Sequence, residues 1–337
     1  MTLFFSRFSM QRLLLFLISI CFITTIFPGC KGKSESKEKL KPKVRIIVSE
    51  EIKNIPIADL FPKTTKRTGK LESEIGDKTK YDYTYGTLAG QYGRYKTAEK
   101  HLIMALKKEP LFIDAHHNLG LAYYMMGRVN DAVKEWRETL RLDPGYAETY
   151  YNLAIFLLDH NRKSDAVTML SRCIQVNPVH LKARYALGKM AQEDGKNQEA
   201  IRHFKAYQTK DRGDLRVHIA LGELYLLENQ IDSSLKEFEA ASRIDDKNSK
   251  VHYKLGVLYH RKKRFDLAIN HYKRATEISP DNADAYINLG DVFSYRHEYA
   301  SALASYNAAL GIDPGNTYAQ KKAAEAEKIL LVKDSGS

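Results

Sequence analysis

The sequence has 337 residues, a formal net charge of +12, 19 Gly, 9 Pro and three Cys. A chain of this length holds about two average domains or one array of small units. The basic excess does not indicate nucleic-acid binding, because no concentrated Lys/Arg stripe follows a predicted structured element. Apart from the first thirty residues, the composition is that of an ordinary soluble protein.

Residues 1–29 have the pattern of an export signal. Arg7 and Arg12 precede an uncharged apolar run, residues 13–27, which is short for a spanning helix of about 20 residues. The sequence around Cys30 resembles a bacterial lipobox, although Phe27 stands where Leu is usual. The resemblance implies cleavage before Cys30 and lipidation of that cysteine. A plain secretory signal and an uncleaved anchor are the alternatives.

Residues 30–78 are predicted to form a basic, flexible tether. Residues 31–80 hold 14 Lys/Arg and 8 Asp/Glu, and 14 minus 8 is a net charge of +6. Anionic headgroups attract such segments by about 1 kcal/mol per basic residue near the surface, but a solubilising linker is the simpler interpretation. Residues 44–62 are more apolar, and we expect them either to be a recognition segment or to fold back on the rest of the chain.

From residue 79 onward the sequence repeats every 34 residues without an insertion. Position 8 of each repeat is Gly or Ala, position 20 is Ala or Ser, and position 24 is large. Apolar residues at i, i+3, i+4 and i+7 predict two amphipathic helices per repeat, and Pro at position 32 of five repeats ends the second helix. Repeats 1 to 7 are residues 79–112, 113–146, 147–180, 181–214, 215–248, 249–282 and 283–316.

This pattern resembles the tetratricopeptide repeat. The resemblance implies an all-α fold, a right-handed α-solenoid of seven helix–turn–helix units, with a capping helix and tail over residues 317–337. Residues that tolerate a tight turn stand between the two helices of four repeats. They are Gly127, Asn161, Gly195 and Asn229. Cys173 is expected to be a buried packing residue.

The sequence offers no catalytic motif. It contains neither a Gly-rich phosphate loop nor a His-Glu-x-x-His motif, and the adjacent His116 and His117 point to different faces of one helix. The repeats leave too little chain for a separate catalytic domain. We therefore expect no enzyme activity, no metal and no cofactor.

The first helix of each repeat carries a second face, made by positions 2, 5, 9, 12 and 13, opposite its predicted core face. In tetratricopeptide proteins this face lines the concave groove, and here it is apolar and aromatic where a solvated face would be polar. Asn at position 6 resembles a clamp on an extended peptide, because an amide both donates and accepts. Packing between neighbouring first helices is the alternative. The predicted groove residues are His117, Asn118, Leu121, Tyr124, Tyr151, Asn152, Ile155, Leu158 and Tyr185.

Together, the repeats and the anchor predict a lipid-anchored adaptor of the bacterial cell envelope. We expect it at the outer membrane, facing the periplasm or the surface, rather than at the inner membrane. Its expected partner is a protein or an extended peptide, for envelope assembly or for secretion or pilus machinery, with no nucleic acid and no small-molecule substrate. The alternatives are a regulator that recruits a cell-wall hydrolase and a non-catalytic substrate-binding arm of an enzyme complex.

Overall fold

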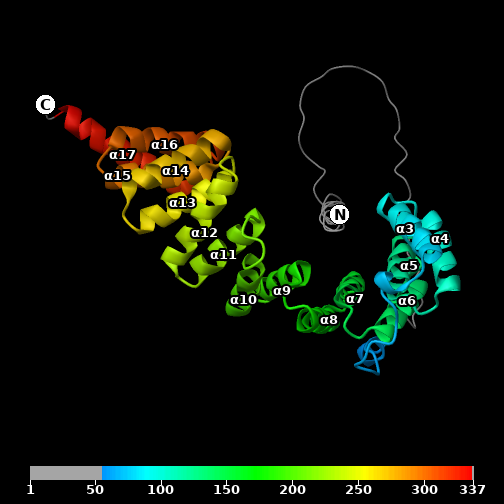
Figure 1. Ribbon diagram of the computed structural model, residues 1–337. Helices are drawn as coiled ribbons and strands as arrows, with labels where there is room; N and C mark the ends of the chain where they lie inside the picture. The colour runs from blue at the N-terminus through cyan, green and yellow to red at the C-terminus, as the bar shows by residue number, and fades with distance from the viewer. Residues whose placement is uncertain (1–54, 336–337) are drawn as a thin grey trace, which may run out of the picture. The chain divides into compact units, whose positions relative to one another are not determined.

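The computed structural model describes residues 55–335, so the predicted signal, Cys30 and residues 44–54 lie outside the described residues. Two short 3-10 helices, η1 (Ile57–Leu60) and η2 (Glu72–Glu74), precede a series of α-helices (Figure 1). These are α3 (Asp77–Gln91), α4 (Tyr95–Lys108), α5 (Ile113–Met125), α6 (Val129–Leu142), α7 (Ala147–Asp159), α8 (Lys163–Val176), α9 (Leu181–Glu193), α10 (Asn197–Gln208), α11 (Leu215–Leu227), α12 (Ile231–Ile244), α13 (Ser249–Arg261), α14 (Phe265–Ile278), α15 (Ala283–Tyr295), α16 (Tyr299–Ile312) and α17 (Thr317–Ser335).

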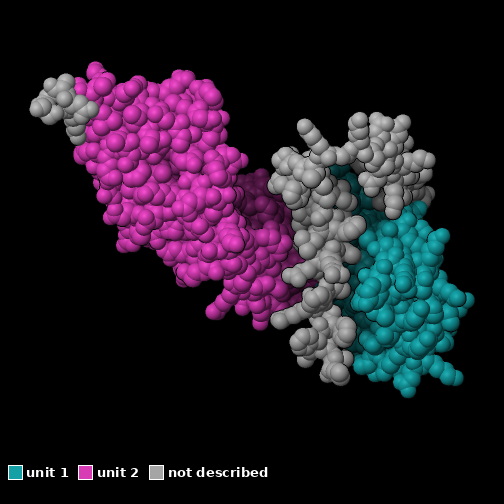
Figure 2. All heavy atoms as spheres, turned by 90° about the horizontal axis from the view of Figure 1, so that it is seen from above, with its two compact units in different colours: residues 1–169 teal, residues 170–337 magenta. Residues whose placement is uncertain are grey.

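Each predicted repeat contains one pair of helices, and neighbouring helices pack on each other from α3 to α7 and from α9 to α17. Between residues 55 and 335 there is no β-strand, and one isolated bridge joins Lys70 to Phe112. The helix α17 packs on α16, as expected for a cap. These observations confirm the predicted all-α class. The chain divides into two compact units, residues 1–169 and 170–337 (Figure 2). The boundary between them falls within α8.

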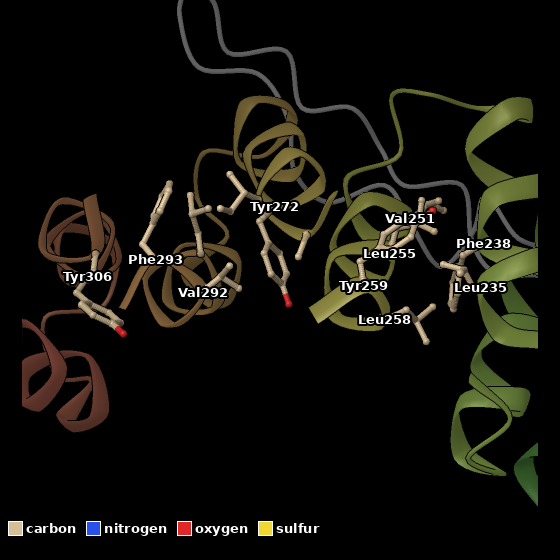
Figure 3. Close-up of a cluster of buried hydrophobic side chains, with 14 of the residues drawn as sticks. Leu235, Phe238, Val251, Leu255, Leu258, Tyr259, Tyr272, Val292, Phe293 and Tyr306 are labelled. Carbon is tan, nitrogen blue, oxygen red and sulfur yellow. The ribbon is translucent and has the colours of Figure 1, made fainter. Parts of the chain in front are cut away.

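Inside a repeat, the two helices meet where a glycine lies against an aromatic ring. A Cβ added to Gly256 of α13 would come within 2.5 Å of the Tyr272 ring of α14. Figure 3 shows Tyr272 and Tyr306 within the buried cluster of the second compact unit. The equivalent contacts join Gly120 to Trp136, Gly188 to Phe204, Gly222 to Phe238 and Gly290 to Tyr306. In these repeats the ring at position 24 therefore leaves no room for a larger residue than glycine at position 8.

The turn between the two helices is the same in every repeat. Its residue at position 15 has a positive φ, and the next backbone N–H donates to the carbonyl of position 11, as in Arg128 to Tyr123 at 2.9 Å. The positive-φ residues are Gly93, Gly127, Asn161, Gly195, Asn229, Lys263 and His297. The turns predicted from Gly and Asn are confirmed. Lys263 and His297 adopt the same conformation, although their residue types do not favour it.

Residues 55–76 follow the first compact unit from repeat 3 back to repeat 1. The Leu60 side chain is only 1% exposed, and the Phe61 ring lies 6.2 Å from the Tyr150 ring. Hydrogen bonds run from Arg162 Nη1 to Ile55 O, from Thr68 N to Leu142 O and from Lys70 N to Leu111 O, each 2.7 Å long. This part of the predicted flexible tether is therefore packed on the helices. Burial of its apolar residues offsets the entropy lost on ordering.

Candidate partner-binding site

The first helices of repeats 2 and 3, α5 and α7, are joined by side chains. His117 Nδ1 lies 2.8 Å from Thr149 Oγ1, and Asn152 Nδ2 lies 3.4 Å from His117 Nε2. Because the amide donates to Nε2, the imidazole proton belongs on Nδ1, where it bonds to Thr149. The His117 ring also contacts the Tyr146 ring at 4.9 Å. These contacts hold α5 beside α7.

Two of the predicted groove residues are almost completely covered. The side chains of His117 and Tyr151 are each 7% exposed. Their burial is that of packing residues, which the sequence had left open as the alternative to contact with a partner. Truncation of Tyr151 would therefore change the stability of the fold as well as any binding surface.

The predicted peptide-clamping asparagines link neighbouring first helices. Asn118 Nδ2 donates to Tyr83 Oη at 3.2 Å and to Thr87 Oγ1 at 3.0 Å. In repeat 7, Asn288 Nδ2 donates to Tyr253 Oη at 3.2 Å, and Asn152 approaches His117 in the same way. Position 6 therefore bonds to position 5 of the preceding repeat. A peptide that used these amide nitrogens would replace existing bonds, which lowers its net gain.

An apolar surface remains accessible along the same two helices. Leu121 and Met125 of α5 are partly exposed, and so are Ile155 and Leu158 of α7. We call these four residues the α5–α7 face. They lie outside the positions that fill the helix-pair core, so the first compact unit retains apolar area that the fold does not bury.

Tyr124 borders the α5–α7 face. Its hydroxyl donates to the carboxylate of Asp159, and its ring lies 5.5 Å from the Trp136 ring. Burial and the neighbouring Asp159 raise the pKa of Tyr124, so its phenol stays a neutral donor at physiological pH. The hydroxyl therefore ties the end of α5 to the end of α7.

Tyr185 belongs to the second compact unit. Its ring packs edge-on against Phe204 and Tyr207, and the Arg216 guanidinium lies 4.8 Å from its centroid. The grouping of Tyr185 with the groove residues of repeats 2 and 3 stays a prediction, because Tyr185 lies in a different compact unit from them.

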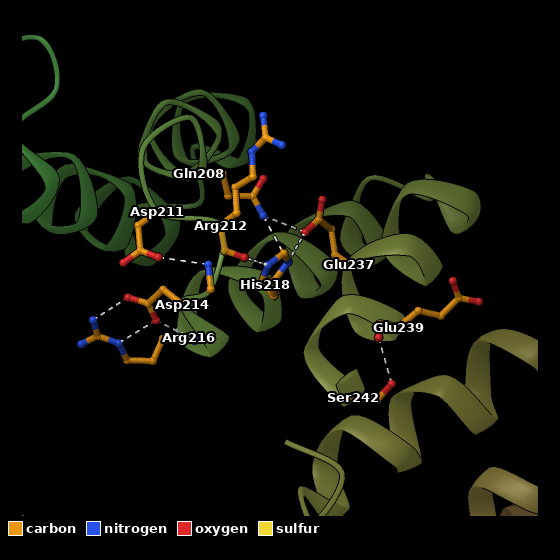
Figure 4. A network of polar contacts seen from close by, with 10 residues as sticks. Gln208, Asp211, Arg212, Asp214, Arg216, His218, Glu237, Glu239 and Ser242 are labelled. Atoms are coloured by element: carbon orange, nitrogen blue, oxygen red, sulfur yellow. Dashed lines mark hydrogen bonds and ion pairs between the residues drawn. The ribbon is translucent and has the colours of Figure 1, made fainter. Parts of the chain in front are cut away.

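The side chain at position 4 makes a hydrogen bond that recurs in several repeats and was not predicted from the sequence. His218 Nε2 donates to Arg212 O at 2.9 Å, while its Nδ1 lies 2.7 Å from Glu237 Oε2 (Figure 4). Each such residue holds the carbonyl at position 32 of the preceding repeat, and so fixes the loop between repeats. The other members are His116 on Pro110 O, Tyr150 on Pro144 O, Arg184 on Pro178 O, His252 on Asp246 O and Gln320 on Pro314 O. Aligning position 4 with position 23 would have revealed the His–Glu pairs at 116/135 and 218/237.

Repeat 6 departs from this pairing, because His271 replaces the glutamate. His271 Nδ1 lies 3.1 Å from His252 Nδ1, and its ring stacks on the Tyr259 ring. Burial, and then the charge of His252, lower the pKa of His271 to about 4. A histidine whose folded pKa is depressed contributes its full stability above the unfolded value of about 6.5 and loses it as the pH falls toward 4.

We therefore expect the second compact unit to be about 1 kcal/mol less stable at pH 5 than at pH 7.5 from this residue, after allowance for its partial exposure. His271→Glu should reverse the sign, because a carboxylate there would accept from protonated His252. Glu237 does so for His218, whose pKa it raises. Urea unfolding at the two pH values measures both proteins, and an unchanged pH dependence in the variant would contradict the assignment.

Among residues 55–335 there is no cluster of three or more His, Cys, Asp and Glu side chains that could hold a metal ion. Within the same range, every helix is too short or too polar to cross a bilayer.

Comparison with known families identifies the repeats. Models described as tetratricopeptide repeat match residues 113–146, 151–214, 191–258 and 283–316, and a model described as TPR repeat matches residues 258–295. No relative was found among curated proteins.

Solved structures of similar fold are also tetratricopeptide proteins. One is YrrB, described as a TPR protein with an unusual peptide-binding site, at 20% identity, 57% coverage of this chain, 97% coverage of that chain and a TM-score of 0.51. Another is the C-terminal part of a TPR repeat-containing protein from Cytophaga hutchinsonii, at 14% identity, 71% and 98% coverage, and a TM-score of 0.54. At these identities the likeness concerns the fold. With the family matches and the observed helix pairs, it shows that this chain belongs to the tetratricopeptide-repeat family.

Proposed function

We propose that this chain is a scaffold that binds a segment of a partner protein across the α5–α7 face. The observation that carries the proposal is the accessible apolar area of Leu121, Met125, Ile155 and Leu158, which the helix-pair core does not use. A peptide-binding site in YrrB, a protein of the same fold, is consistent with this role.

The structure also favours a rigid platform for such binding. The bonds from His117 to Thr149 and from Tyr124 to Asp159 join α5 and α7 near both ends of the face. A surface that is already ordered loses little conformational entropy when a partner binds. A bound segment would therefore be recognised by apolar contacts with both helices, rather than by a change in their arrangement.

The predicted lipid anchor at Cys30 gives this scaffold a place in the cell. An adaptor tethered to a membrane of the cell envelope would hold its partner near an assembly, secretion or pilus apparatus. This part of the proposal rests on the amino-terminal sequence pattern and on the basic residues that follow it.

The binding role can be tested with peptides selected from a random display library on the purified protein. Leu158→Ser should weaken a selected peptide about tenfold, because burial of a leucine side chain contributes about 1.5 kcal/mol or more to affinity. Leu226→Ser is the matched control, because Leu226 is a partly exposed leucine at the same position of repeat 5.

Titration calorimetry on both variants separates the outcomes. Loss of affinity in Leu158→Ser with wild-type affinity in Leu226→Ser would support the α5–α7 face. Equal affinity in both variants, or a loss confined to Leu226→Ser, would reject that location. Circular dichroism at increasing temperature checks that each variant remains folded.

A further inference from the structure

The first helix of the repeats, α3, and its C-cap residue Tyr92 expose a stripe of large apolar side chains. Tyr81, Tyr85, Leu88 and Tyr92 are 68%, 43%, 44% and 75% exposed. The spacing of four, three and four residues places them on one side of the helix. We call these four residues the α3 stripe. It is independent of the α5–α7 face and plays no part in the binding proposed there.

In later repeats, the equivalent face is covered by a helix. Tyr81, Tyr85 and Leu88 occupy positions 3, 7 and 10, and the residues at these positions in repeats 2, 5 and 6 are all buried. Those residues are Ala115, Leu119 and Ala122, then Val217, Leu221 and Leu224, then Val251, Leu255 and Leu258. The second helix of the preceding repeat packs against each of these first helices, as α4 does on α5 and α12 does on α13. The α3 stripe is thus a face of the kind that receives a helix.

The chain segment before α3, as far as it is described, leads away from the stripe. Lys70 bonds to Leu111, and Ile55 bonds to Arg162 of repeat 3. Residues 55–76 therefore run along repeats 1 to 3 and supply no helix that could take the place of a preceding repeat.

The spacing of the stripe fits a second copy of the same helix. Intervals of four, three and four residues read identically in both directions, so two antiparallel α3 helices match each other around a twofold axis. In that arrangement Tyr81 lies opposite Tyr92 of the second copy, and Tyr85 lies opposite Leu88. The same intervals are the alternating d and a positions of a heptad, which suit packing of one helix on another.

We propose that two copies of this chain associate through antiparallel packing of their α3 stripes. A fully covered tyrosine buries about 200 Å² of surface. Multiplied by the exposed fractions of the three tyrosines, this gives roughly 370 Å² of surface that pairing could bury per copy, and roughly 740 Å² in the pair. This area lies below that of standard specific interfaces, which marks the dimer as a weak one. Membrane attachment would raise the local concentration of the two copies and favour their pairing.

The test uses photo-crosslinking of the full chain in cells. Two copies with different epitope tags are co-expressed, and one carries benzoylphenylalanine in place of Tyr85. Irradiation should give an adduct that contains both tags, and peptide mapping should place the bond near Leu88. The control carries the same probe in place of Leu227, which is 69% exposed in the second compact unit, and should give no such adduct.

A second experiment places a charge on the opposing α3 stripe. Leu88→Lys in the copy without the probe should reduce the two-tag adduct at least tenfold, because each pairing would bury an unpaired ammonium group. Leu227→Lys should leave the yield unchanged. The proposal is overturned if the Tyr85 probe gives no two-tag adduct, or bonds to lipid or to another protein instead. It is also overturned if Leu88→Lys leaves the yield intact.

Discussion

Trp136→Ala is expected to destabilise the first compact unit by about 3–5 kcal/mol, the usual range for removing a buried tryptophan. Trp136 is fully buried in α6, and its ring occupies the space that a Cβ on Gly120 would need. The same ring supports Tyr124 at the edge of the α5–α7 face. Its loss therefore leaves a cavity between α5 and α6 and removes a contact beneath the candidate site.

Trp136→Phe is the matched control for this change. Phe204 and Phe238 occupy the equivalent position of repeats 4 and 5, so the ring is compatible with the site. The indole Nε1 of Trp136 is buried with no hydrogen-bond partner among the described residues, and phenylalanine removes that unpaired group. We expect a change within about 1 kcal/mol. Hydrogen exchange should show the alanine defect first in α5 and α6, whereas uniform loss along the chain would contradict nearest-neighbour packing.

Gly256→Ala is expected to destabilise the second compact unit by about 2 kcal/mol. Its new Cβ would lie 2.5 Å from ring atoms of Tyr272, a fully buried side chain that cannot retreat into solvent. Overpacking of this kind costs about 1–3 kcal/mol and outweighs the better helix propensity of alanine. Thermal unfolding of the purified protein measures the change.

The control is Gly311→Ala in α16, where an added Cβ meets no atom within 4 Å. That variant should gain up to about 1 kcal/mol, because alanine stabilises a helix relative to glycine. The double change Gly256→Ala/Tyr272→Leu reproduces the Ala154 and Leu170 combination of repeat 3 and should recover part of the loss. Equal effects of alanine at both glycines would show that helix propensity, and not contact with the ring, decides the outcome.

The packing inside a repeat could be read from the sequence. Gly256 and Tyr272 stand at fixed positions of a 34-residue period, and this period alone indicates which residues share a helix face. The turns at Gly127 and Asn161 were equally visible, because these residue types tolerate a positive φ. Lys263 shows the limit of that reasoning, since tertiary packing imposes the same turn on a residue with no such preference.

Contacts between repeats were much harder to predict. Whether Asn118 faces solvent or Tyr83 depends on the angle between α5 and α3. The residue periodicity of a single helix does not specify that angle. The burial of His117 and Tyr151 was hard to predict for the same reason, because it also depends on how neighbouring first helices are oriented. Residues 55–76 belong to a longer segment whose charged composition suggested a tether, but a few apolar side chains such as Leu60 suffice to pack them on the helices.

The junction between repeats 4 and 5 illustrates the same limit. Tyr207 and Arg212 depart from the family pattern there, yet Tyr207 Oη donates to Asp214 Oδ2 at 2.7 Å and His218 holds Arg212 O. Polar side chains thus replace the usual small residue and proline with hydrogen bonds. A repeat consensus identifies the substitution but does not reveal the partner that accommodates it.

The most direct measurement of partner binding is crosslinking from a selected peptide that carries one photoreactive residue. Mass spectrometry of the adducts then locates the peptide on the protein. Binding at the α5–α7 face predicts adducts within residues 113–125 and 147–159, and their loss in Leu158→Ser. Adducts confined to α4, α6 or residues 55–76 would contradict the proposed site.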